Sequence, residues 1–264
     1  MKKFFAFVAT AMLCISCLVF ASCGTPVEEI SIVAPASTEI RAGETFALEY
    51  TTVPEEAAEK AKVQWQISDS TKLSYSKGEF TALTCGKVKV TAKVKGSDAT
   101  DEIELKVIAP KGFTTYSDTG YKVVYPSSWT ASTLGQIQMW SSANGTPNMN
   151  IATETLNTSY FTSPASAFQT KIETTYSLMG YTVNFTKPVT VKKSKYLGVE
   201  RVRVDYIYTL TAQGSTSSLH QTQMIFNNAK FNLSCVLTFT YYTENYNEAA
   251  EKLQETVFNQ FMPT

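Results

Sequence analysis

Apolar and polar residues alternate with a period of two along much of this chain. That pattern restricts a segment to a β-strand with one buried face. Between residues 87 and 95, valine or alanine occupies every second position, and lysine or threonine occupies the positions between. Turn residues separate the stretches of this kind that recur between residues 30 and 107, so the sequence predicts an all-β sandwich of about 80–90 residues. The predicted strands are Ile30–Val33, Phe46–Tyr50, Val63–Ile67, Val88–Val94 and Ile103–Val107.

One predicted strand carries a row of lysines on its outward face, which read alone could be a polyanion site: Lys87, Lys89, Lys93 and Lys95. The outward face of the next strand carries Glu102 and Glu104. If the two strands form a hairpin, the lysines lie beside the glutamates and are compensated by cross-strand pairing. We interpret this face as solvated and as protecting the sheet edge.

A series of motifs between residues 41 and 92 resembles the bacterial immunoglobulin-like domain of group 2. The motifs are Arg41–Thr45, Val53–Pro54, Val63–Asp69, Gly78–Leu83 and Cys85–Ala92. The family usually has serine where Asp69 stands and a small residue where Cys85 stands. The resemblance implies a β-sandwich over residues 23–109 that acts as a spacer or an adhesive module on a bacterial surface, and it implies no catalytic residue. Trp65, between Val63 and Ile67, is expected to be a core aromatic.

Residues 109–112 form a short linker, after which the pattern changes to strands mixed with two helical periods. Ser163–Pro164 begins the first helix, which Gly180 ends, and the second runs from about Glu244 to Phe261. The order of these elements predicts an α+β fold over residues 110–264, an antiparallel sheet with packed helices. The predicted strands are Gly135–Trp140 and Asn148–Thr155, which flank a turn at Asn144–Gly145, then Tyr181–Thr190, Val199–Tyr208, Leu219–Phe226 and Phe231–Tyr242.

This second segment resembles the PsbP-like family, including its bacterial lipoprotein relatives. The resemblance rests on Phe113–Tyr116, on Gly120–Trp129, and on the terminal order of a hairpin, Tyr241–Tyr242 and a helix that ends at Phe258–Phe261. Known relatives serve mainly as accessory or binding proteins for larger complexes. The resemblance therefore implies a binding role, and it carries no metal or cofactor residue over to this chain.

The first 23 residues have the pattern of a bacterial lipoprotein signal. Lys2 and Lys3 precede an uncharged, mostly apolar run from Phe4 to Phe20, which is short for a membrane-spanning helix. The stretch from Phe20 to Cys23 resembles a lipobox, although Phe20 stands where leucine is usual and Cys17 is a second candidate. We expect residues 1–22 to be a signal peptide and Cys23 to be the lipidated residue. The mature protein would then be extracytoplasmic, lipid-anchored to the bacterial cell membrane or cell surface.

Residues with catalytic or ligating chemistry are sparse. His220 is the single histidine. The 23 basic residues balance the 23 acidic residues, so the charge of the chain gives no signature of nucleic-acid binding. Outside the first 23 residues only Cys85 and Cys235 remain as cysteines, and they are expected to be buried and free. We expect no cofactor, no metal and no catalytic residue.

Four acidic residues allow two weaker interpretations, a calcium site and a surface ion pair. Asp98, Asp101 and Glu102 could hold calcium, although a solvated turn is the simpler interpretation. Asp205 alternates with Arg201 and Arg203, which indicates surface ion pairing.

These observations predict a non-catalytic, lipid-anchored cell-envelope protein that presents a PsbP-like binding or accessory domain on an immunoglobulin-like spacer. Its partners would be the membrane, through the lipid, and an envelope protein or a surface glycan. Four aromatic residues could support recognition, although each is expected to be structural: Trp129, Trp140, Tyr241 and Tyr242. Two alternatives stay open, a surface adhesin that binds through its immunoglobulin-like module and a carboxylate-dependent hydrolase.

Overall fold

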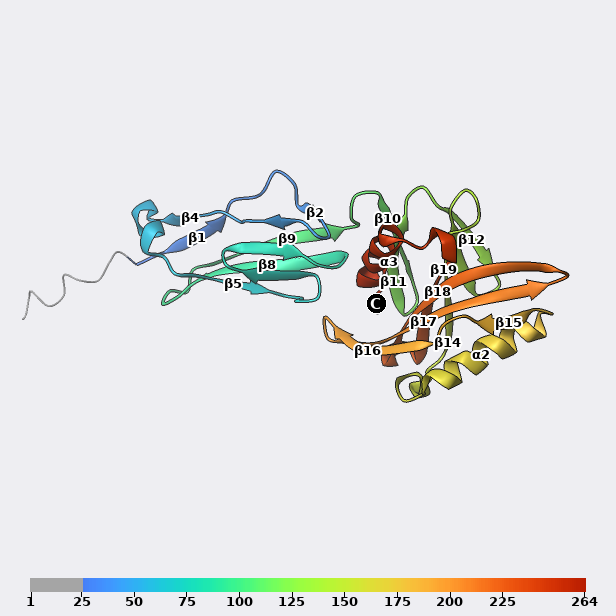
Figure 1. Cartoon of the computed structure of the whole chain (residues 1–264). Helices are drawn as coiled ribbons and strands as arrows, with labels where there is room; N and C mark the ends of the chain where they lie inside the picture. The colour runs from blue at the N-terminus through green and yellow to red at the C-terminus, as the bar shows by residue number, and fades with distance from the viewer. Residues whose placement is uncertain (1–25) are drawn as a thin grey trace, which may run out of the picture.

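The computed structural model describes residues 26–264, so the predicted signal peptide and Cys23 lie outside the described residues. The described chain forms an N-terminal region of β-sheets, residues 26–109, and a C-terminal α+β region, residues 110–264 (Figure 1). Among these residues no helix is both long and apolar enough to cross a bilayer. The coarse prediction of β-sheets followed by an α+β region is thus confirmed.

The N-terminal region contains three sheets, with strand orders β2-β9-β8-β5, β3-β7-β6 and β1-β4. The strands are β1 Glu29–Ile32, β2 Glu39–Arg41, β3 Thr45–Phe46, β4 Tyr50–Val53, β5 Val63–Ile67, β6 Leu73–Ser76, β7 Glu79–Ala82, β8 Gly86–Val94 and β9 Thr100–Ile108, and a 3-10 helix spans Glu55–Lys60. The prediction of one strand over Phe46–Tyr50 was wrong. The chain there passes from the sheet of β3 to the sheet of β4, and Leu48 is buried at the crossing.

The core of this region lies between the sheets. Phe80 and Leu73 from one sheet are fully buried against Val90 and Leu105 from another. Trp65 is half-buried and packs against this cluster, with its ring edge-to-face on Phe80 at a centroid distance of 5.4 Å, as expected for a core aromatic.

The predicted hairpin of β8 and β9 is confirmed, and its outward charges are paired. The Lys87 ammonium lies 2.8 Å from the Glu104 carboxylate, and the Lys89 ammonium lies 2.7 Å from Glu102. These pairs are solvent-exposed, so each contributes little to stability. Two of the four lysines in the row are therefore compensated by glutamates of the next strand, which favours a solvated face over a polyanion site.

The C-terminal region is built on an eight-stranded antiparallel sheet. Its order is β12-β13-β14-β19-β18-β17-β15, and β16 also pairs with β17. The strands are β10 Phe113–Asp118, β11 Tyr121–Pro126, β12 Thr130–Leu134, β13 Ile137–Ser141, β14 Asn148–Thr155, β15 Thr182–Phe185, β16 Thr190–Tyr196, β17 Val199–Ala212, β18 Ser215–Asn228 and β19 Leu233–Tyr242. The helices are α2 Ala165–Leu178 and α3 Glu248–Gln260, with 3-10 turns at Thr158–Phe161, Ala229–Phe231 and Thr243–Asn245.

Three boundaries differ from the prediction. Pro188, which has no backbone N–H, lies in the break between β15 and β16, so Tyr181–Thr190 is not one strand. The strand predicted to begin at Leu219 begins at Ser215 in β18, because the chain turns tightly at Gln213 and Gly214, both with positive φ. Helix α3 begins at Glu248 and not near Glu244, because the Asn247 side chain accepts from the Ala250 N–H and caps the helix there.

The two faces of the large sheet are covered unequally. Helix α3 and the β10–β11 hairpin together cover one face, and the core there includes Val257, Phe258 and Phe239. On the other face α2 packs alone against β15, β16 and β17, with Phe168 and Ile172 buried against Val204 (Figure 1). A helix about 10–12 Å across covers only two or three strands spaced about 4.8 Å apart. The strip of this face formed by β14, β19 and part of β18 is left without a covering helix.

The residues after α3 are fixed between two strands of the C-terminal region. Met262 and Lys122 exchange backbone hydrogen bonds of 2.8 and 3.0 Å in an isolated bridge. The buried Arg201 guanidinium donates to the Phe261 carbonyl at 2.5 Å and lies 3.0 Å from the Met262 sulfur. Phe261 is thereby held in the core against Tyr121 and Phe226.

We expect Phe261→Ala to lower the free energy of unfolding by about 3–5 kcal/mol, because it removes a fully buried ring and leaves a cavity. The measurement is denaturant unfolding followed by circular dichroism. The control Leu178→Ala removes a side chain that is 85% exposed and should change that free energy by about 0.5 kcal/mol or less. Equal effects of the two substitutions would show that the segment after α3 is not part of the core.

Candidate functional site

The uncovered strip of the sheet forms the floor of an open groove beside α2. Two adjoining cavities of about 370 and 800 Å³ make up this groove, and both are lined by Tyr176 and Met179 from the C-terminal end of α2. The floor of the first cavity comes from residues of β14, β18 and β19 that point to the α2 side: Asn150, Ala152, Gln221, Gln223, Val236 and Thr238. The second cavity continues past Thr240 and Tyr242 toward the turn between β17 and β18.

The floor presents side-chain amides and hydroxyls whose orientation is fixed by buried tyrosines. The Tyr206 hydroxyl donates to Gln223 Oε1 at 2.9 Å, and the Tyr208 hydroxyl donates to Gln221 Oε1 at 3.1 Å. Because a carboxamide carries its acceptor and its donors on different atoms, these bonds engage the oxygen and orient the NH₂ group. The Gln221 NH₂ group also donates to the Thr240 hydroxyl at 3.5 Å. The groove floor therefore offers positioned neutral donors.

Aromatic and thioether side chains form the walls. Tyr176 is half-buried, and its hydroxyl lies 3.2 Å from that of Tyr208. Met179 and Tyr181 follow at the end of α2 and are exposed, and Tyr242 stands at the far side of the groove with 40% of its surface exposed. In such an arrangement one face of a ligand can stack on an exposed aromatic ring while polar groups of the groove form hydrogen bonds to the edge of the ligand.

The two charged residues lining the first cavity compensate each other. Lys171 Nζ lies 3.9 Å from a Glu154 carboxylate oxygen, and the same ammonium lies over the Tyr160 ring and donates to its hydroxyl. The groove is therefore close to neutral, which favours an uncharged ligand.

The opposite face of the sheet contains the cluster around Asp205. The Arg203 guanidinium contacts Asp205 at 3.1 Å and also Glu255 of α3, and the Thr222 hydroxyl donates to Asp205 at 2.8 Å. The predicted pairing of Arg203 and Asp205 is confirmed, but its placement on the surface was wrong, because α3 covers this face and buries most of both side chains. Arg201 is buried as well and bonds the segment after α3.

His220 lies beside this cluster without completing a catalytic arrangement. Its Nε2 atom is 4.0 Å from Asp205 Oδ1, beyond hydrogen-bonding distance, and its ring packs at a tilt of 43° against Tyr246, with centroids 3.7 Å apart. The neighbouring carboxylates, Asp205 and Glu255, both contact Arg203. These contacts describe a structural ion-pair network.

The remaining sequence candidates lie in different places. Trp140 and Tyr241 are buried in the core beneath α3, and Trp129 is half-buried against Phe239, so only Tyr242 of the four aromatics reaches the groove. Cys85 and Cys235 are free and buried, as expected. The sequence pattern did not identify the groove residues on β14 and β18. In β19, threonine and tyrosine alternate with the buried apolar residues, and this alternation could have indicated a polar face.

The calcium alternative is not supported by the placement of its residues. The Ile32 N–H donates to Asp101 at 2.7 Å, while Glu102 turns outward to Lys89. Within residues 26–264 no three histidine, cysteine, aspartate or glutamate side chains are grouped closely enough to hold a metal ion.

No family model and no curated protein matches this chain. Among solved structures it is similar to a protein from Bacteroides thetaiotaomicron, with 13% identity, a TM-score of 0.37, and coverage of 57% of this chain and 48% of the other, so this chain spans about half of that protein. It is also similar to the Ran-binding protein Mog1p of Saccharomyces cerevisiae, with 10% identity, a TM-score of 0.36, and coverage of 57% and 95%. A third structure is PA94, a protein of unknown function from Pseudomonas aeruginosa, with 14% identity, a TM-score of 0.29, and coverage of 55% and 94%.

The similarity to Mog1p falls on the C-terminal α+β region. Because the TM-scores lie below 0.5, we base no functional conclusion on these similarities.

We expect the contribution of Asp205 to stability to disappear in acid. Burial raises the pKa of Asp205, but the hydrogen bonds and charge of Arg203 and the hydrogen bond from Thr222 outweigh it, and the pKa is lowered from 3.8 to about 2. A carboxyl with a lowered pKa stabilises the fold above its unfolded pKa, and this stabilisation is lost as the pH falls from about 4 to about 2. Asp205→Asn should therefore cost about 2 kcal/mol near neutral pH and progressively less toward pH 2.

The measurement is the free energy of unfolding of both proteins as a function of pH. Asp98→Asn, in an exposed turn, controls for the loss of one carboxylate from the chain. A gap between wild type and Asp205→Asn that is the same at all pH values would contradict the assignment.

Proposed function

We propose that this chain is a non-catalytic protein of the bacterial cell envelope that binds a neutral surface glycan in the groove beside α2. In this proposal Cys23 carries a lipid anchor, the N-terminal region is an immunoglobulin-like spacer, and the C-terminal region is a PsbP-like binding domain. The apolar run after Lys2 and Lys3 and the lipobox-like stretch support the anchor, and the order of sheets and helices supports the two domain types.

The observation that carries the proposal is the chemistry of the open sheet face. Gln221, Gln223 and Asn150 supply amides on the floor, and Tyr176 and Tyr242 supply aromatic surface at the walls. A sugar ring presents an apolar face for stacking and hydroxyls that both donate and accept. The neutral, amide-rich and tyrosine-lined groove matches these two properties together.

A peptide strand fits this position less well. An extended peptide binds mainly by adding to the edge of a sheet, where unpaired backbone groups supply regular hydrogen bonds. The groove floor lies on β14, β19 and β18, which are interior strands whose backbone groups are already paired with neighbours. A ligand here meets only side chains, so it must bring its own hydrogen-bonding groups.

The N-terminal region is better suited to spacing than to binding. The outer face of β8 and β9 presents lysine–glutamate pairs that are satisfied within the region, and Trp65 is engaged with Phe80 and Tyr75. These contacts favour the spacer role over the adhesin alternative.

We expect Tyr242→Ala to weaken glycan binding by about tenfold, because an exposed aromatic that contacts a ligand contributes about 1–2 kcal/mol. Gln223→Ala should weaken it to a similar degree through the loss of an oriented amide. The probe is an array of bacterial capsular and lipopolysaccharide-derived oligosaccharides, followed by calorimetric titration of the strongest binder with the chain from residue 24 onward, which retains every described residue.

Tyr75→Ala is the matched control, because Tyr75 is also 40% exposed but lies in the N-terminal region. It should leave the affinity unchanged. A loss of binding in Tyr75→Ala with no loss in Tyr242→Ala would make the immunoglobulin-like module the binder. If in-cell crosslinking through the groove captures an envelope protein and the array shows no glycan, the accessory-subunit role would replace the glycan proposal.

A further inference from the structure

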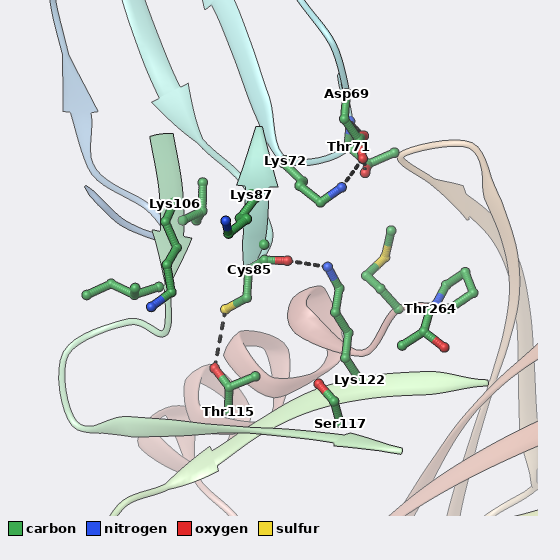
Figure 2. Close-up of a pocket in the computed structure, with 15 residues that line it drawn as sticks. Asp69, Thr71, Lys72, Cys85, Lys87, Lys106, Thr115, Ser117, Lys122 and Thr264 are labelled. Carbon is green, nitrogen blue, oxygen red and sulfur yellow. Dashed lines mark hydrogen bonds and ion pairs between the residues drawn. The ribbon is translucent and has the colours of Figure 1, made fainter. Parts of the chain in front are cut away.

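A further cavity of about 640 Å³ lies where the N-terminal and C-terminal regions meet (Figure 2). The N-terminal region contributes the turn before β6, the start of β8 and the end of β9. The C-terminal region contributes β10, β11 and the residues after α3. This cavity is separate from the groove beside α2 and shares no lining residue with it.

Direct hydrogen bonds fix the two walls of this cavity relative to each other. The Gln260 side chain donates to the Leu83 carbonyl at 2.6 Å and accepts from the Cys85 N–H at 3.1 Å. The Lys122 ammonium donates to the Cys85 carbonyl across the same junction. Cys85 itself packs into the core of the C-terminal region. The cavity is therefore built into a joined interface and does not depend on a loose contact.

The lining is strongly basic, with four lysines and one aspartate among its residues: Lys72, Lys87, Lys106, Lys122 and Asp69. Two of the lysines have their charge compensated by exposed ion pairs: Lys87 pairs with Glu104, and Lys106 pairs with Glu39 at 2.7 Å. Lys72 pairs with Asp69, which also accepts from the Thr71 hydroxyl.

Lys122 is the lysine without a carboxylate. Within residues 26–264, Lys122 forms no ion pair within 4.0 Å, and its ammonium group donates a hydrogen bond to the neutral Cys85 carbonyl. Burial lowers the pKa of Lys122 and the nearby charge of Lys72 lowers it further, which together outweigh the opposite effects of Cys85 and Asp69. A charged group that is mostly removed from water is costly unless an opposite charge or several hydrogen bonds compensate it.

Gly86 leaves room for both lysine side chains. Its φ of +139° and its missing side chain allow Lys72 to lie directly over the backbone, because a Cβ atom there would be 2.6 Å from Lys72 Cε. The same Cβ position would be 3.7 Å from Lys122 Nζ. Figure 2 shows Lys72 reaching into this space from the N-terminal region and Lys122 reaching into it from β11. Two like charges thus approach each other, one from each region; Lys72 is paired with Asp69, whereas no carboxylate of the described residues lies within 4.0 Å of Lys122.

We propose that this cavity binds an oxyanion, either free phosphate or the phosphate group of a small molecule, between the ammonium groups of Lys72 and Lys122. The anion would compensate the charge of Lys122, and it would draw together lysines from the two regions. The hydroxyl group of Ser117 lines the same wall and supplies a further donor, whereas the Thr115 hydroxyl beside it donates to Cys85 Sγ at 3.6 Å. Because the volume exceeds that of phosphate alone, a phosphate ester with a small apolar group against Met262 and Pro263 also fits.

The test is calorimetric titration of the chain from residue 24 onward with inorganic phosphate and with phenyl phosphate at low ionic strength. Lys122→Met and Lys72→Met should each weaken binding by about tenfold or more, since a charge-assisted hydrogen bond contributes about 1.5–3 kcal/mol. Lys93→Gln, which removes a charge from the exposed outer face of β8, is the matched control and should leave the affinity unchanged.

The two probes distinguish the sources of the anion. Saturable binding of both, lost in the Lys122 and Lys72 variants, supports a site for the phosphate group itself. Binding of phenyl phosphate alone, with the same dependence on the two lysines, assigns the site to a phosphate ester. Absence of saturable binding for both probes, or equal binding by Lys122→Met, Lys72→Met and Lys93→Gln, would overturn the proposal. Circular dichroism spectra matching wild type would show that the variants are folded.

Discussion

One α-helix is too narrow to cover a face of an eight-stranded sheet, and the arrangement of the C-terminal region follows from that limit. On the face covered by α3 and the β10–β11 hairpin, the sheet packs into a core that includes Phe239 and Phe258. Where α2 acts alone, its 14 residues bury the side chains of β17 and leave β14 and β19 uncovered. The narrow width of α2 therefore leaves an open groove on the face that this helix covers.

The junction between the two regions depends on residues that are distant in sequence. Gln260 at the end of α3 contacts Leu83 and Cys85, and Lys122 reaches Cys85 from β11. These bonds join the N-terminal region firmly to the C-terminal region. The basic cavity is a product of this junction, so a ligand that bridges Lys72 and Lys122 would couple anion binding to the geometry of the junction.

The sequence predicted those parts of the fold that local pattern determines. The stripe of Leu233, Cys235 and Leu237 marked a strand with one buried face, and Asn144–Gly145 marked a hairpin. The sequence could not show that Gln221, Asn150 and Thr238 meet on one open face, because their proximity depends on strand order and on where α2 lies. It also placed the Arg203–Asp205 pair at the surface, because strand alternation identifies a polar face but not the helix that covers it.

The most direct measurement is a crystal structure of the chain from residue 24 onward with the oligosaccharide that it binds most strongly. The account predicts a sugar ring in the groove beside α2, in contact with Tyr242 or Tyr176 and hydrogen-bonded to the floor amides of β14 and β18. A sugar bound instead to the sheets of the N-terminal region, with the groove occupied by solvent, would contradict the assignment of binding to the C-terminal region.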